Sequence, residues 1–111
     1  MRIYSWEESN IAHIARHGIA PREAQHVVEH ARSPYPEYIG NGKWRVIGKT
    51  SVGRWLQVIF VYPVDEQVEL DSLSISDLPL FISGEAQVVC VIHSRELAHA
   101  EKKRSRKRRK E

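Results

Sequence analysis

The first third of the chain carries the spacing of two amphipathic helices. Residues 5–8 (SWEE) match a capping box, which predicts Ser5 as the N-cap and Glu8 at the third helical position. This helix is expected to run to about His17 and to stop at Gly18, since glycine readily takes the left-handed conformation that closes many helices.

A second helix is predicted to start at Pro21, which is tolerated in a first helical turn. Apolar residues at the three-and-four spacing of a buried helix face follow it: Ala24, Val27, Val28 and Ala31. The helix should end at residues 33–36 (SPYP), because proline cannot continue the hydrogen-bond ladder.

From residue 38 onward the pattern changes to that of strands. Residues 38–39 and 44–47 flank Gly40-Asn41-Gly42, whose Asn-Gly pair favours a tight hairpin, and residues 49–53 form a second predicted turn. Residues 54–62 (RWLQVIFVY) and 88–93 (VVCVIH) are apolar on both faces and predict central strands. A last helix is expected from Arg95 to about Arg104. The order predicts an α+β domain with two N-terminal helices, a small antiparallel sheet and a C-terminal helix.

Composition and length restrict the class of protein. The chain has 111 residues, of which 41% are hydrophobic and 28% charged, as in a single globular domain. It has no apolar run long enough to cross a membrane and no secretory signal pattern, and its one cysteine, Cys90, suits a reducing compartment. We therefore expect a cytoplasmic protein.

Charge is unevenly distributed behind a formal net value of +3. Residues 63–87 hold six acids and no Lys or Arg, whereas residues 101–111 hold eight basic residues and two acids. These blocks predict one domain over residues 1–104 with an acidic insertion at about 63–87, followed by a basic tail at 105–111. The insertion is expected to form an extra strand. It is also expected either to occupy a cationic groove as a mimic of phosphate or to fold against the basic tail.

His13 and His17 lie four residues apart and should project from one side of the first helix, in line with Trp6 and Asn10. Such a pair can bind zinc, but the glutamate of the HExxH motif is missing and no cysteine or carboxylate cluster supplies a third ligand. The sequence thus predicts neither a metal nor a cofactor. The stripe predicts either a polar surface anchored by Trp6 or one wall of a groove.

Arginines mark the predicted strands. Arg45 alternates with apolar neighbours, Arg54 opens the next strand, and Arg95 follows the last one. Converging guanidinium groups suit phosphate binding, because their planar fork matches phosphate oxygens and stays charged. No Gly-rich phosphate loop is present, which argues against nucleotide hydrolysis.

Several segments together resemble the BrnT-type ribonuclease toxins of type II toxin–antitoxin pairs. The N-terminal match consists of Trp6, Asn10, His13-Ile14, Arg16 to Ile19, Pro21 and Glu23-Ala24. The later matches are Arg45 to Gly48, Thr50, Gly53-Arg54, Leu56, Val91-Ile92, Ser94-Arg95 and Ala100-Glu101. The resemblance covers about residues 1–62 and 88–104.

This resemblance implies a RelE-like fold, metal-independent RNA cleavage, and a hetero-oligomer with an antitoxin of the ribbon-helix-helix type. Cleavage of this kind needs a base for the 2′-hydroxyl, an acid for the leaving oxygen, and cations for the phosphoryl charge. We assign proton transfer to His17 or Glu101 and phosphate contacts to Arg45, Arg54 and Arg95. His13, Lys49, Lys102, Lys103 and Arg104 are expected to bind RNA.

This chain departs from the family pattern at three places. The acidic insertion replaces a short hairpin loop, Ser94 stands where an alanine is common, and Ser105 stands where a tyrosine often follows the final basic residues. An alternative function is therefore a catalytically inactive nucleic-acid-binding or interaction module, whose basic tail would bind through counterion release.

Overall fold

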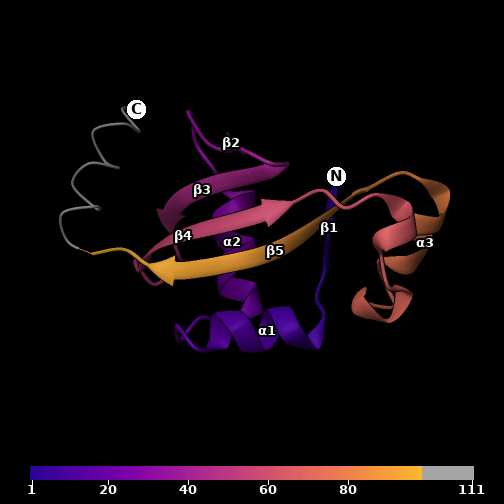
Figure 1. Ribbon diagram of the computed structural model, residues 1–111, viewed down its shortest axis with the longest axis horizontal. Coiled ribbons are helices and arrows are strands. Elements are labelled where there is room, and N and C mark those ends of the chain that lie inside the picture. The colour runs from indigo at the N-terminus through magenta and orange to yellow at the C-terminus, as the bar shows by residue number, and fades with distance from the viewer. Residues whose placement is uncertain (99–111) are drawn as a thin grey trace.

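The computed structural model describes residues 1–98. The elements in chain order are β1 (Arg2–Ser5), α1 (Glu8–Ala15), α2 (Pro21–Glu29), β2 (Glu37–Gly40), β3 (Lys43–Lys49), β4 (Trp55–Val61), α3 (Leu78–Ser83) and β5 (Gln87–Glu96). Two short 3₁₀ turns, Asp65–Gln67 and Leu70–Ser72, precede α3 (Figure 1). The α+β class is confirmed.

The five strands form one mixed sheet in the order β1-β5-β4-β3-β2. Four of them are antiparallel neighbours, but β1 runs parallel to the first half of β5, from Arg2 opposite Gln87 to Ser5 opposite Cys90. The prediction of a purely antiparallel sheet is wrong, because the N-terminal residues form a strand before the first helix.

The predicted capping box is also wrong. Ser5 is the last residue of β1, and its hydroxyl is hydrogen-bonded to that of Ser72 at 2.7 Å. The helix starts two residues later than expected, at Glu8, and ends at Ala15, although Gly18 does take a left-handed φ of 71°. The second helix starts at Pro21 as predicted.

The hairpin prediction is confirmed. β2 and β3 pair across Asn41 and Gly42, whose φ values of 54° and 73° are those that a tight two-residue turn requires. The second predicted turn is present as well, with Gly53 at φ 86° leading into β4. β4 is a central strand, hydrogen-bonded to β3 on one side and β5 on the other.

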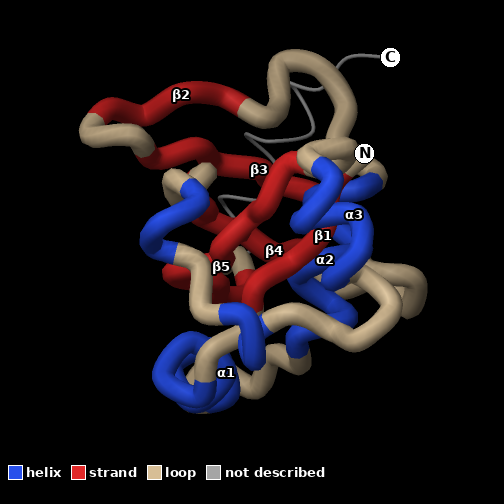
Figure 2. The backbone as a smooth tube through the Cα atoms, turned by 90° about the vertical axis from the view of Figure 1, so that its right-hand side faces the viewer, coloured by secondary structure: helices blue, strands red, loops and turns tan. Residues whose placement is uncertain are grey.

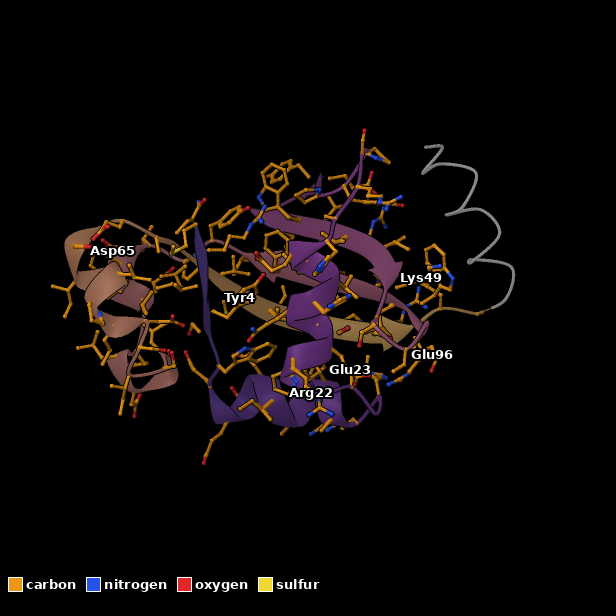
Figure 3. The ribbon with its side chains drawn as sticks, turned by 180° about the vertical axis from the view of Figure 1, so that it is seen from behind. Tyr4, Arg22, Glu23, Lys49, Asp65 and Glu96 are labelled. Carbon is orange, nitrogen blue, oxygen red and sulfur yellow. The ribbon has the colours of Figure 1, made fainter. Side chains whose placement is uncertain are left out.

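The main core lies between α2 and one face of the sheet (Figures 2 and 3). Alternate residues of the three middle strands point into it, and those that are fully buried include Val46, Leu56, Val58, Phe60, Val89 and Val91. A Cβ on Gly48 would lie 3.5 Å from Val27 of α2, which places this side of β3 directly under the helix. Within the described residues, no helix covers the opposite face of β3 and β4.

The last strand continues where a helix was expected. β5 reaches Glu96, with Arg95 opposite Gln57, and the Leu97 N–H donates to the Trp55 carbonyl at 2.9 Å. Ser94 is fully buried and its hydroxyl donates to the Gln57 carbonyl at 3.0 Å. The helix predicted from Arg95 is therefore wrong over the described part, because these residues extend the ladder with β4. The rest of that prediction lies outside the described residues.

The segment between β4 and β5 holds the two 3₁₀ turns and α3, and no strand, so the predicted extra strand is wrong. Its apolar residues pack instead with Ile3 and Val88 in a second cluster that includes Val68, Leu73, Leu78, Leu80, Phe81 and Ala86. Asp65 lies at one end of the molecule and Lys49 and Glu96 lie at the other (Figure 3). No helix within residues 1–98 is long and apolar enough to span a membrane.

Candidate functional site

The open face of the sheet carries a group of polar residues from several strands. Direct cross-strand pairs place Arg45, Ile59 and His93 in one row, and Gln57 and Arg95 in the next. Paired residues share a face, and Val58 and Ser94 between these rows point into the core, so the two rows point away from it. Arg45 and His93 are two strands apart, which separates their Cα atoms by about 10 Å.

α1 closes one side of this face. β1 pairs only with β5 residues up to Cys90, and α1 packs against β5 in its place. Asn10 lies near Cys90, with the thiol 3.7 Å from the amide oxygen, and His13 lies beside His93. Part of the predicted stripe therefore lies along the border of this face, namely Asn10 and His13. This arrangement corresponds to the interpretation of the stripe as one wall of a groove.

Three histidines gather at this border. His13 Nε2 and His93 Nδ1 are 3.2 Å apart, and His17 stands one helical turn beyond His13. The ring centroid of His17 lies 6.0 Å from that of His13 and 5.4 Å from that of His93. One ring nitrogen from each histidine lies within 4.8 Å of the others. His13 and His93 are half-buried, whereas His17 is exposed.

The surroundings of His93 favour its neutral form. Burial lowers its pKa, and a positive charge on His13, His17 or Arg95 lowers it further. His93 is therefore neutral at pH 7 and can accept a proton or a hydrogen bond there. His13 and His93 are within hydrogen-bond distance, so in a neutral pair one ring donates to the other.

Arg45 is engaged by a carboxylate of the neighbouring strand. Its Nε and Nη2 donate to Glu37 Oε1 at 2.8 and 2.6 Å, and the two side chains are 31% and 22% exposed. A phosphate at Arg45 would therefore have to compete with Glu37 for the guanidinium group.

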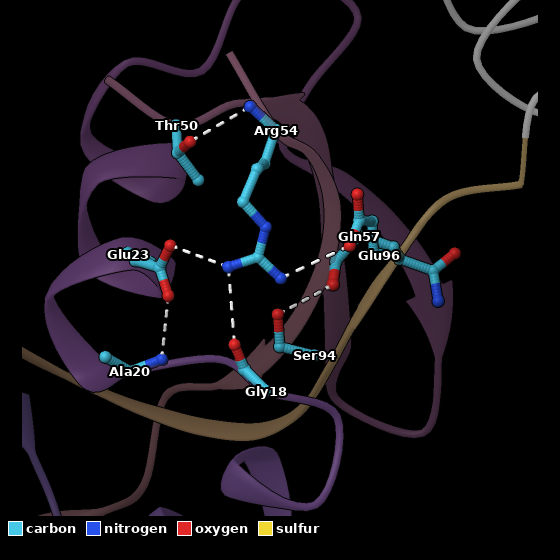
Figure 4. A network of polar contacts seen from close by, with 8 residues as sticks. All are labelled: Gly18, Ala20, Glu23, Thr50, Arg54, Gln57, Ser94 and Glu96. Atoms are coloured by element: carbon cyan, nitrogen blue, oxygen red, sulfur yellow. Dashed lines mark hydrogen bonds and ion pairs between the residues drawn. The ribbon is translucent and has the colours of Figure 1, made fainter. Parts of the chain in front are cut away.

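Arg54 points away from this face, towards α2 and the turn before it (Figure 4). Its Nη1 donates to Glu23 Oε2 at 2.9 Å and to the Gly18 carbonyl at 3.3 Å, and its Nη2 donates to Glu96 Oε1 at 3.3 Å. Glu23 also accepts from the Ala20 N–H with its other oxygen at 3.0 Å. Arg54 thus joins α2, the α1–α2 turn and β5, and does not converge with Arg45.

The other predicted site residues are scattered or undescribed. Lys49 is exposed at the end of β3, with its Nζ 5.7 Å from the ring centre of Trp55. Glu101, Lys102, Lys103 and Arg104, together with the basic tail, lie outside the described residues. The acidic segment is remote from Lys49 and Glu96, so it does not cover the Arg54 end of the sheet (Figure 3).

Sequence reasoning overlooked His93 as a site residue. It is 80 positions from His13 along the chain, and no local spacing connects the two. The available signal was the pair His93 and Arg95, which share a face if the strand continues beyond residue 93. Ending that strand at His93 concealed the pair.

Comparisons with known proteins identified no relative. No family model, no curated protein and no solved structure matches this chain.

Proposed function

We propose that this protein is a BrnT-like ribonuclease toxin that cleaves RNA without a metal ion and is neutralised by a cognate antitoxin. The observation that carries the proposal is the group of three histidines at the border of an open sheet face that also bears Arg45 and Arg95. These residue types supply both requirements of RNA cleavage, namely proton transfer near neutral pH and cations for the phosphate.

The His13–His93 pair has the chemistry of an acid and a base. If both rings are neutral and joined by one hydrogen bond, the donor ring keeps a lone pair on its outer nitrogen, and the acceptor ring keeps a proton on its outer nitrogen. One nitrogen can then take the 2′-hydroxyl proton while another donates to the leaving oxygen. His17 is the most exposed of the three histidines, so we assign to it, together with His93, the exchange of a proton with the incoming RNA.

Arg45 and Arg95 are assigned to the phosphate, and Arg54 is reassigned to positioning. The guanidinium of Arg54 is shared by Glu23 and Glu96 on the other side of the sheet. Glu101 remains a candidate for proton transfer from outside the described residues. The antitoxin, expected to be of the ribbon-helix-helix type, would form a hetero-oligomer that covers the cationic face in the cytoplasm.

The test is cleavage of bulk RNA by the full-length chain in excess EDTA. His17→Ala and His93→Ala should each lower the rate by about 100-fold or more, as expected when a proton-transfer group is lost. His30→Ala is the matched control, because His30 is an exposed histidine that directly follows α2. Cleavage should leave 2′,3′-cyclic phosphate ends. Full activity of the His17→Ala/His93→Ala double variant would refute the assignment.

The alternative is a nucleic-acid-binding module without catalysis. It is favoured by the carboxylates that engage Arg45 and Arg54, since these leave less positive charge for a transition state. In that case RNA would bind with a steep dependence on salt and remain intact, and expression without the antitoxin would not arrest growth. Growth arrest that the His93→Ala variant relieves would exclude this alternative.

A further inference from the structure

The three histidines also have the composition and spacing of a metal site. Zn²⁺ binds histidine nitrogens at about 2.0–2.1 Å in a tetrahedral arrangement, which separates neighbouring ligand atoms by about 3.3 Å. The 3.2 Å between His13 Nε2 and His93 Nδ1 matches one edge of that tetrahedron. Nitrogens of all three rings already lie within 4.8 Å of one another.

Only a small rearrangement is needed for all three histidines to bind one ion. His13 and His93 are held between α1 and β5, whereas His17 is exposed and can rotate about its side-chain bonds. His13 lies in the last turn of α1 and His17 lies four residues further on, in the turn that follows the helix, and a four-residue spacing can bring two imidazoles to one ion. A side-chain rotation of His17 would bring its nitrogen to a third vertex and leave the fourth open.

The ligand chemistry restricts the ion. Three imidazole nitrogens suit Zn²⁺ and its first-row neighbours, whereas Mg²⁺ and Ca²⁺ prefer oxygen ligands. Three protein ligands leave one tetrahedral position open, as in zinc sites that bind water or a substrate. Arg95 on the same face places a positive charge nearby, which opposes a cation and favours an anionic group at the open position.

We propose that His13, His17 and His93 bind one divalent transition-metal ion, with Zn²⁺ as the reference ion and the fourth position open. Metal binding is independent of the proposed function. Its consequence for RNA rests on that function: a bound ion takes the imidazole lone pairs that proton transfer needs, so Zn²⁺ inhibits the nuclease.

The first experiment measures metal binding without RNA. The full-length chain, freed of metal with a chelator, is titrated with Co²⁺ and followed by visible absorption, and Zn²⁺ is measured by calorimetry. The wild type should bind one ion. His13→Ala, His17→Ala and His93→Ala should each weaken binding by more than about tenfold, since even outer-shell changes cost 10–100-fold.

The chain contains a matched control for these variants. His26 in α2 and His30 directly after it have the same four-residue spacing and stacked rings 4.1 Å apart, but no third histidine belongs to that pair in the described part of the chain. His26→Ala and His30→Ala should leave the affinity unchanged. The site would be refuted if the wild type binds no Co²⁺ or Zn²⁺, if His93→Ala binds like the wild type, or if the α2 variants lose as much affinity. Thermal unfolding in EDTA verifies that each variant is folded.

The second experiment compares RNA cleavage in EDTA and in stoichiometric Zn²⁺. Inhibition by Zn²⁺ that is reversed by chelator is the expected result. Stimulation by Zn²⁺ would overturn the inhibitory role and leave the metal site intact. If the wild type binds Co²⁺ but cleaves no RNA under either condition, the proposed function fails while the metal site stands.

Discussion

Arg54 is expected to stabilise the fold rather than to bind a phosphate, and its replacement allows this distinction to be measured. Arg54→Ala removes the Nη1 contacts with Glu23 and the Gly18 carbonyl and the Nη2 contact with Glu96. Glu96 is 47% exposed, so its ion pair contributes at most about 0.5 kcal/mol. Glu23 is 19% exposed, and a charge-assisted hydrogen bond at such a site contributes about 1.5 kcal/mol.

The sum predicts a loss of about 2 kcal/mol in the free energy of unfolding. For a chain of this size, 1 kcal/mol corresponds to about 4 °C, so the melting temperature should fall by about 8 °C. Urea unfolding followed by circular dichroism measures the free energy directly. Arg22→Ala is the control. Arg22 is exposed and lies next to Glu23 on α2, so its replacement should change stability by less than about 0.5 kcal/mol.

A double-mutant cycle tests the cause. Glu23→Gln retains an oxygen for the Ala20 N–H and removes the charge that faces Arg54. Combining it with Arg54→Ala should give a coupling energy of about 1 kcal/mol. A coupling near zero, or an Arg54→Ala variant of wild-type stability that no longer cleaves RNA, would refute the structural role and restore Arg54 to the phosphate.

Three other predictions concern the turn, the core and the cysteine. Gly42→Ala should cost about 1 kcal/mol in urea unfolding because its φ is 73°, whereas Gly48→Ala, with ordinary contact distances and no left-handed φ, should cost less. Phe60→Ala should cost about 3–5 kcal/mol because the ring is fully buried, and Ile75→Ala, 88% exposed, should lie within about 0.5 kcal/mol of the wild type. Burial raises the pKa of the Cys90 thiol, so in the folded protein at pH 8 the thiol should react with iodoacetamide more slowly than in urea. The rate in the folded protein should increase as the pH rises. Equal rates in the folded protein and in urea would contradict this environment.

The features that the sequence predicted correctly are those that local chemistry determines. The Asn41-Gly42 turn needs two positive φ values, Pro21 is suited to a first helical turn, and the apolar run of β4 predicts a strand with neighbours on both sides. Each of these signals is contained within a few neighbouring residues. They were sufficient for the α+β class, the hairpin, the second helix and the two central strands.

The errors arise where distant residues decide the structure. Ser5 has the pattern of a helix cap, but pairing with β5 makes it a strand residue. The residues after His93 are polar and helix-compatible, but Ser94 is buried by the neighbouring strand, and its hydroxyl bonds to the Gln57 carbonyl. The apolar residues of the acidic segment suggested a strand, but they pack against Ile3 and Val88. Local propensity is weaker than such packing.

The candidate site follows from one of these distant pairings. β1 is only four residues long, so it pairs with β5 up to Cys90 and leaves the remaining edge of that strand without a strand neighbour among the described residues. α1 packs there instead, and the end of the helix and the turn that follows it can bring two side chains to the same strand residue. This is how His13 and His17 meet His93. Another strand paired with β5 along that edge would have kept them apart. The same short strand that sequence reasoning overlooked therefore accounts for the group of histidines on which both the proposed nuclease and the proposed metal site depend.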